Sequence, residues 1–194
     1  MTKPLILGFD PSKATGWAVF DTAKHLSAIE CGVFEMPAKA DHYFTGDQIA
    51  RKTLELIKQI GSKRISFAVL EEQALAQVGR SGADSIIYPW VSTTGIVGVL
   101  ANFGIPYGTI APGAWRKMFY GQGFKPPLDK NKKNDWKAAA IIACERENIT
   151  LPTRKTLAHN AAEACAVAIC WKGAKFHARR YEERFMALRM GQAA

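Results

Sequence analysis

The chain has 194 residues, which is enough for one domain with a sizeable core and a short appendage. No apolar run reaches the roughly 18 residues that a membrane span needs, and the first residues lack the long apolar stretch of a signal peptide, so we expect a cytoplasmic protein. Lysine and arginine number 26 against 17 acidic residues. The formal charge of +9 favours a polyanionic partner, with a basic surface kept for solubility as the alternative.

The first part of the chain predicts an antiparallel meander of about three strands. Short apolar runs at 5–9, 16–20 and 31–34 are separated by turn-like residues. Residues 49–60 place apolar side chains between charges with the spacing of an amphipathic helix. Residues 65–70 then predict a buried strand that runs directly into two glutamates.

The second part predicts mainly helices. Residues 88–103 are mostly apolar with small residues, which indicates a buried helix, and 107–110 predict a strand that Pro112 ends. Residues 135–147 predict a helix with Asp135 as its N-cap, and 156–171 predict a strongly buried one. The order of elements indicates one mixed α/β domain over 1–172, with a central sheet of about five strands flanked by helices. A basic helical tail follows over 173–194.

Between these helices, residues 121–134 form a loop rich in glycine, proline and lysine. Its length of about 14 residues is at the long end for compact domains. Loops of this kind are usually functional or disordered.

Two predicted strands end in acidic residues. Asp10 ends the first strand and precedes a proline, where it can hold a metal, although a turn residue is the ordinary explanation. Glu71 and Glu72 follow the strand over 65–70. Because adjacent side chains of a strand point to opposite faces, one of the two can face a site while the other meets solvent. Ordinary surface acids remain the alternative for this pair.

A third polar group lies inside an apolar helix. His159, Asn160 and Glu163 stand among alanine, cysteine, valine and isoleucine, where ionised residues are rare unless they are paired or bind a metal. Helical spacing puts Asn160 and Glu163 on one face and His159 near Glu163. The alternative is a helix N-terminus whose first turn is supported by polar residues.

Together these acids predict a metal-dependent chemistry. Carboxylates from two strand ends and one helix can converge on two Mg²⁺ ions, which activate water and stabilise the leaving oxygen of a phosphodiester. Hard divalent cations prefer oxygen ligands of this kind. The three signals are each weak, and they become stronger in combination.

Three stretches of the chain resemble the RuvC family of Holliday-junction resolvases. Leu-Gly-Phe-Asp-Pro-Ser at 7–12 and Thr-Gly-Trp-Ala at 15–18 are similar to the family's opening strands. Phe-Ala-Val-Leu-Glu-Glu-Gln at 67–73 resembles its second acidic strand, and 161–168 resembles its last helix. The stretches occur in the family's order, and Trp-Arg-Lys at 115–117 with the lysine-rich loop looks like phage-type members.

The resemblance implies an RNase H-like fold and a structure-selective endonuclease that cuts four-way DNA junctions with Mg²⁺, for which Mn²⁺ can substitute. It assigns catalytic and metal-binding roles to Asp10, Glu71 and Glu163. Glu71 is preferred to Glu72 because it comes directly after the apolar run. The chain departs from the family at Ser12, where the family has glycine, and at Glu163, where it has aspartate.

A further departure concerns the fourth metal ligand. The family's other helix acid falls on Asn160, which carries no charge. His159, one residue earlier, can take its place, because some members use histidine in this helix. Both residues are therefore predicted metal ligands, and His159 is also a predicted catalytic residue.

The resemblance further implies a homodimer on branched DNA. The apolar helix around 86–100 can form the dimer interface, or it can be buried within the monomer. Lysines ahead of the penultimate helix contact DNA in this family, and the matching positions are Lys125, Lys130, Lys132 and Lys133. A solvated charged loop is the alternative for them. Phe119, Tyr120 and Phe124 beside these lysines can stack on exposed bases.

Three other classes of protein fit parts of the pattern. An RNase H-fold nuclease that acts on forks, flaps or RNA would carry the same acids. A junction-binding protein that has lost catalysis would explain the uncharged Asn160. An actin-like ATP-binding protein also opens with such a strand, but it needs a second domain and phosphate loop that the sequence does not show.

Overall fold

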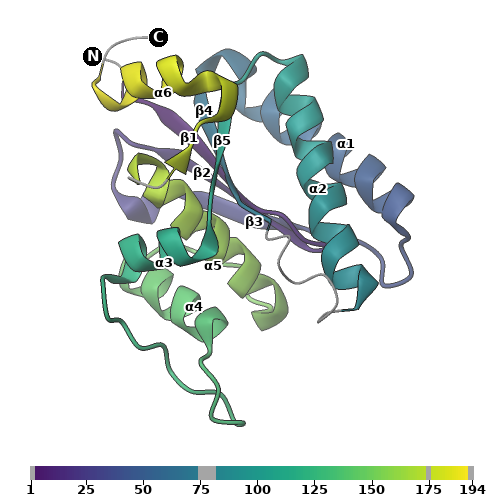
Figure 1. Cartoon of the computed structure of the whole chain (residues 1–194), viewed down its shortest axis with the longest axis vertical. Coiled ribbons are helices and arrows are strands. Elements are labelled where there is room, and N and C mark those ends of the chain that lie inside the picture. Colours follow the sequence, from purple (N-terminus) through teal and green to yellow (C-terminus); the bar gives the residue numbers. More distant parts are fainter. Residues whose placement is uncertain (1–2, 74–81, 174–175, 192–194) are drawn as a thin grey trace.

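The computed structural model describes residues 3–73, 82–173 and 176–191. At its centre is a six-stranded sheet in the order β3-β2-β1-β4-β5-β6 (Figure 1). The strands are β1 (Leu5–Asp10), β2 (Thr15–Asp21), β3 (Glu30–Phe34), β4 (Ile65–Glu71), β5 (Tyr107–Ile110) and β6 (Phe176–His177). Strand β2 is antiparallel to both of its neighbours, β1 and β3, whereas β4 and β5 run parallel to β1. The predicted mixed α/β fold and its meander are confirmed, with β6 as an unpredicted edge strand.

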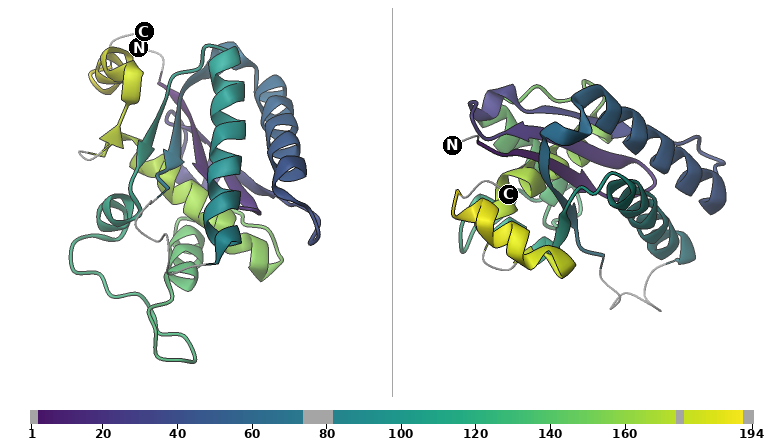
Figure 2. Two further views of the ribbon diagram at one scale, coloured as in Figure 1. Left: turned by 45° about the vertical axis from the view of Figure 1, so that its right-hand side comes forward. Right: turned by 90° about the horizontal axis from the view of Figure 1, so that it is seen from above.

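Helices cover both faces of this sheet (Figures 1 and 2). On one face, α1 (His42–Ile60) and α2 (Ala83–Asn102) pack against each other and against Leu7 and Phe9. On the other face, α5 (Lys155–Ile169) packs on Ile6 and Val69, with α3 (Pro112–Tyr120) and α4 (Trp136–Arg146) outside it. Neighbouring side chains of β1 therefore enter two different cores, as the alternation of a strand requires.

Two glycines let α5 lie directly on the sheet. A Cβ atom at Gly8 of β1 would collide with the Ala164 carbonyl oxygen, and one at Gly16 of β2 would collide with the Asn160 carbonyl oxygen. The helix facing them has alanine at six of its 15 positions, so its own side chains also permit a close approach. This packing brings the polar residues of α5 down to the ends of β1 and β4.

The structure corrects the predicted start of α1. That helix begins at His42 rather than near residue 49, and Asp41 is its N-cap through a 2.7 Å hydrogen bond from the Phe44 amide. The early turns were missed because Tyr43 and Phe44 are exposed, so they break the amphipathic pattern. By contrast, the predicted cap at Asp135 is confirmed, since its carboxylate accepts from the Ala138 amide at 2.9 Å.

The prediction that the second helix is buried is wrong for most of its surface. Helix α2 begins at Ala83, and its buried residues are Ser92, Ile96 and Leu100. Ile87 and Trp90 are exposed. Only one stripe of this apolar helix therefore packs on the monomer.

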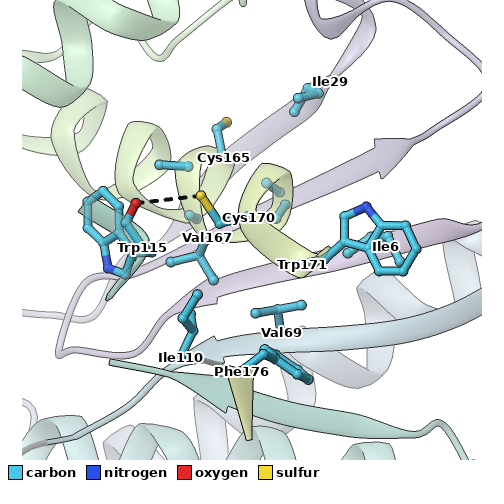
Figure 3. Packing of buried hydrophobic residues seen from close by; sticks show 14 of the residues in the cluster. Ile6, Ile29, Val69, Ile110, Trp115, Cys165, Val167, Cys170, Trp171 and Phe176 are labelled. Carbon is cyan, nitrogen blue, oxygen red and sulfur yellow. Dashed lines mark hydrogen bonds between the residues drawn. The ribbon is translucent and has the colours of Figure 1, made fainter. Parts of the chain in front are cut away.

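Helix α3 was not predicted. Pro112, which was expected only to end a strand, also occupies the first turn of this helix, where its missing N–H removes no hydrogen bond. The Cys170 thiol at the end of α5 donates to the Trp115 carbonyl oxygen at 3.6 Å and so ties α3 to α5 (Figure 3). Trp115 is fully buried in the same core as Val167 and Ile110.

The C-terminal segment packs against the sheet rather than extending from it. Phe176 of β6 and Phe185 of α6 (Glu182–Arg189) are buried and contact Phe67 of β4. Residues 174–175 and 192–194 of the predicted tail lie outside the described residues. Within the described ranges, no helix combines the length and apolar character needed to cross a membrane.

Candidate active site

Three acidic side chains meet at one edge of the sheet. Asp10 and Glu71 are the last residues of β1 and β4, which are parallel neighbours, so their ends lie together. Helix α5 crosses this edge and adds Glu163. Asp10 and Glu163 are about nine-tenths buried, and Glu71 is only partly exposed. The structure therefore brings together the three acids predicted from separate parts of the chain.

Burial raises the pKa of each of these three acids. Burial raises the pKa of Asp10 well above its usual value, and the charges of Glu71 and Glu163 raise it further. Burial raises the pKa of Glu71 to about 7, although a hydrogen bond from Trp115 opposes the shift. Burial also raises the pKa of Glu163, against the lowering effect of Arg116 and Lys137. Ionising these buried carboxylates together costs free energy, and a bound cation would lower that cost.

Two consecutive residues of α3 hold two of the acids. The Trp115 indole N–H donates to Glu71 Oε2 at 2.6 Å. The Arg116 guanidinium lies 3.5 Å from Glu163 Oε1, and it also lies over the rings of Trp115 and Trp136, at 5.2 and 5.0 Å from their centroids. Its Nε atom is buried and has no hydrogen-bond partner among the residues that the structure describes. The sequence analysis missed both roles, because Trp115 and Arg116 can be assigned to a site only once α3 is recognised.

The donor set fits a hard divalent cation, although the side chains are not gathered as finished ligands. Three carboxylates offer the oxygens that Mg²⁺ prefers. Yet no group of three or more His, Cys, Asp or Glu side chains in the described parts of the chain is arranged to hold a metal as it stands. Glu71 and Glu163 are instead engaged by Trp115 and Arg116. Each of these bonds uses one oxygen of its carboxylate, so the second oxygen can still serve as a ligand to a cation.

The two residues proposed for the fourth ligand occupy different environments. Asn160 is buried, one helical turn before Glu163. His159 is half-buried, and its Nδ1 lies 3.3 Å from the Lys155 carbonyl oxygen. Burial and the charge of Lys137 lower the pKa of His159. The structure shows no contact that joins either side chain to the three acids, so the fourth ligand stays a prediction.

The neighbouring acid Glu72 has a different partner. Its Oε1 accepts from Arg179 at 2.9 Å, and the same Arg179 nitrogen bonds the Thr109 hydroxyl. The charges that shift the pKa of Asp10 include Glu71 but not Glu72. This placement agrees with the choice of Glu71 as the site residue.

The lysine-rich loop is folded into a hairpin that projects from the domain between α3 and α4 (Figure 1). Asp129 closes it by accepting from the amides of Asn131 and Lys133, both at 2.8 Å. Lys132 adopts a positive φ of 59° at the tip. All four predicted DNA-binding lysines are exposed, at positions 125, 130, 132 and 133. Lys137 follows on α4 and lies near enough to Asp10 and Glu163 to lower their pKa values.

The predicted stacking residues lie at the base of this hairpin. The Tyr120 and Phe124 rings stack on each other with centroids 4.6 Å apart. Trp136 packs beside both of them. Phe124 remains 38% exposed, so part of this aromatic cluster is accessible to solvent.

Comparisons with known proteins give no match to a family model or to a curated sequence. Solved structures do match. The Thermus thermophilus RuvC in complex with a Holliday junction substrate is similar over 87% of this chain and 92% of its own, with a TM-score of 0.59 and 13% identity. The chain has the RNase H-like fold of RuvC. A second T. thermophilus RuvC structure covers 97% of this chain and 98% of its own, at a TM-score of 0.58 and 14% identity.

The yeast mitochondrial Holliday junction resolvase Ydc2 is also similar, at a TM-score of 0.48 and 11% identity over 98% of this chain and 83% of its own. The RuvC structures confirm the fold predicted from the sequence. At such identities the likeness concerns the fold, and the roles of individual residues must be argued from the site itself.

Proposed function

We propose that the chain is a metal-dependent endonuclease that cuts branched DNA by hydrolysing phosphodiester bonds. The observation that carries this proposal is the meeting of Asp10, Glu71 and Glu163 in one buried cluster. They come from β1, β4 and α5, which are far apart along the chain. A structural core would gain nothing from three mutually repelling buried carboxylates, whereas a metal site requires them.

The acids would hold two Mg²⁺ ions, or Mn²⁺ in their place, with His159 or Asn160 as a further ligand. Metal bound there would activate a water molecule and stabilise the leaving oxygen. Trp115 would keep Glu71 oriented through its 2.6 Å hydrogen bond. Arg116 and Lys137 supply positive charge beside the acids, where a phosphate diester would also be attracted.

The hairpin at 121–134 would bring DNA to this site. Its exposed lysines suit contacts to phosphates, which position a nucleic acid without reading its sequence. The RuvC of known structure with this fold is bound to a Holliday junction, and we extend that substrate class, the four-way junction, to this chain. The stacked Tyr120 and Phe124 add an aromatic surface for an unpaired base.

We also propose that the chain acts as a homodimer. The exposed apolar face of α2, with Ile87 and Trp90, is not covered by the rest of the described monomer. A second copy would cover it and present two acid clusters to a branched substrate with two-fold symmetry.

A cleavage assay tests the proposal. Synthetic four-way junctions, forks and RNA–DNA hybrids are incubated with Mg²⁺, with Mn²⁺ or with chelator. We expect cutting of the junction that depends on the metal, and we expect Asp10→Asn to abolish cutting while junction affinity remains, because the lysines are intact. Full activity of Asp10→Asn would overturn the assignment.

The same assay separates the two fourth-ligand residues. Loss of activity in His159→Ala with a neutral Asn160→Ala assigns the role to histidine, which also predicts higher activity with Mn²⁺ than with Mg²⁺. The reverse result assigns it to Asn160. Junction binding without cutting in the wild type would instead indicate a binding protein that has lost catalysis.

A further inference from the structure

The turn that follows Asp10 is fixed by hydrogen bonds to its own residues and to α2. The Ser12 amide donates to Thr15 Oγ1 at 3.2 Å, and that hydroxyl donates back to the Ser12 carbonyl oxygen at 2.6 Å. The Ser92 hydroxyl of α2 donates to the same carbonyl oxygen at 2.8 Å. Two hydroxyl donors therefore occupy both lone pairs of one backbone oxygen, two residues after the acid.

Lys13, the next residue of this turn, is bound entirely within the protein. Its ammonium donates to the carbonyl oxygens of Ala38 and Ala40 at 2.8 and 3.0 Å, and it lies 3.5 Å from the Tyr88 hydroxyl. It also lies 4.5 Å from the centroid of the Tyr88 ring. The Tyr88 hydroxyl in turn donates to Ala40 at 2.8 Å. All three protons of the ammonium have partners, so this lysine has none left for a phosphate.

We propose that Lys13, Tyr88 and Ser92 are positioning residues that hold Asp10 in place for metal binding. Tyr88 and Ser92 lie one helical turn apart on α2, so a single helix fixes both ends of the Ser12–Lys13 step. These hydrogen bonds have a purpose at this position, because the nearby charges of Glu71 and Glu163 repel the Asp10 carboxylate. We call the hydrogen bonds made by Lys13, Tyr88 and Ser92 the brace. Without the brace, the turn after Asp10 can move and carry the Asp10 carboxylate away from the other two acids.

This inference rests on the proposed function, since it takes Asp10 to be a metal ligand. The alternative is that the same hydrogen bonds only stabilise the fold and do not affect metal binding at Asp10. The two differ in what they predict for the fully folded protein. Fold support alters the unfolding temperature only, whereas positioning alters the affinity of the folded chain for metal.

The test is the Mn²⁺ dissociation constant of the full chain, measured by calorimetry without DNA and well below the unfolding temperature. We expect Tyr88→Phe and Lys13→Met each to weaken Mn²⁺ binding by roughly tenfold, the low end for removing an outer partner of a metal ligand. Lys13→Arg, which keeps the charge and donors, should recover part of the loss. Tyr43→Phe is the matched control, because it removes a hydroxyl from an exposed tyrosine of α1.

Asp10→Asn distinguishes the possible failures. If Asp10→Asn loses Mn²⁺ while Tyr88→Phe and Lys13→Met bind it like the wild type, the brace only supports the fold and this inference is wrong, while the metal site stands. If Asp10→Asn itself binds Mn²⁺ normally, both the proposed site and the brace are wrong. Should Lys13→Met not fold, Tyr88→Phe, which removes a single hydroxyl, decides the question.

Discussion

Helix α5 and the hairpin at 121–134 carry the two halves of the proposed function on opposite kinds of structure. Glu163 sits on a buried helix that touches the backbones of β1 and β2, with no room for a side chain at Gly8 or Gly16. The hairpin projects into solvent and is closed by hydrogen bonds to Asp129 within itself. In the proposed function, chemistry that depends on placement would thus be built on packing, whereas attraction for DNA would be built on exposed charge.

This difference predicts that the contact between α5 and the sheet is the more sensitive of the two regions to a small change in packing. In Gly16→Ala, the added methyl group meets the Asn160 carbonyl, which is backbone and cannot rotate away. Helix α5 must shift, and we expect a loss of about 2–3 kcal/mol in the free energy of unfolding. Cleavage should fall by more than the folded fraction does, because Glu163 moves with the helix. Urea unfolding and the cleavage assay measure both effects.

Gly113→Ala is the matched control for this change. Gly113 is exposed in the first turn of α3, and an added Cβ there would have open space around it. The same substitution there should be neutral, or should stabilise by up to about 1 kcal/mol through helix propensity. Equal stability of Gly16→Ala and the wild type would show that α5 is not pinned to the sheet.

A second prediction concerns the charge stored in the site. Glu71 has a pKa raised from 4.5 to about 7, so the folded metal-free protein favours its protonated form. The stability that this group contributes is fully present below pH 4.5 and is lost as the pH rises through 7. Over this interval the folded state keeps a proton that the unfolded chain has already released, so a rise in pH lowers the free energy of unfolding. Glu71→Gln stays neutral at every pH. In chelator, it should be more stable than the wild type at pH 8, by on the order of 2 kcal/mol, and little different at pH 4.5.

Urea unfolding at the two pH values, in the presence of chelator, checks this prediction. Addition of Mg²⁺ at pH 8 should then stabilise the wild type more than Glu71→Gln, because only the wild type has a carboxylate at position 71 that can bind the cation. A difference between the two proteins that does not change with pH would mean that Glu71 is not held in a buried acidic cluster.

The sequence predicted the buried half of this comparison better than its surroundings. Asp10, Glu71 and Glu163 could be found because each stands out against an apolar run whose periodicity fixes a strand end or a helix face. Trp115 and Arg116 could not be found in this way. Their roles depend on α3, a short helix that begins at Pro112, a residue that was expected only to end a strand. They also depend on the hydrogen bond from Trp115 to Glu71 of β4, which lies 44 residues earlier in the chain.

The exposed half was predicted in composition but not in form. Lysines, glycines and prolines at 121–134 indicated a loop, yet nothing in that composition specifies that Asp129 closes it into a hairpin. Helix α2 shows a related limit. Its apolar residues indicate a helix correctly, but they do not say whether the monomer or a partner covers them.

The hairpin should affect DNA affinity while leaving the chemistry intact. Its lysines are exposed, and their charges are held at the tip of a self-closed turn rather than in the core. Changing Lys130, Lys132 and Lys133 together to glutamine should weaken junction binding. It should also flatten the slope of log affinity against log salt by about 0.9 for each phosphate that the variant no longer neutralises, or up to roughly three units. Unfolding free energy and Mn²⁺ affinity should not change, because glutamine keeps the backbone conformation of the hairpin, including the positive φ at Lys132.

The control for this variant removes the same three charges elsewhere. Lys3, Lys58 and Lys63 are exposed and lie at the opposite end of the domain, since Lys3 and Lys63 precede the strands that end in Asp10 and Glu71, and Lys58 is in the last turn of α1. Their change to glutamine lowers the net charge equally, so it measures the long-range attraction of the whole protein for DNA. A steeper salt slope for the control than for the hairpin variant identifies the hairpin as a contact surface. Equal slopes would show that net charge alone attracts the DNA, and that the contacting face lies elsewhere on the domain.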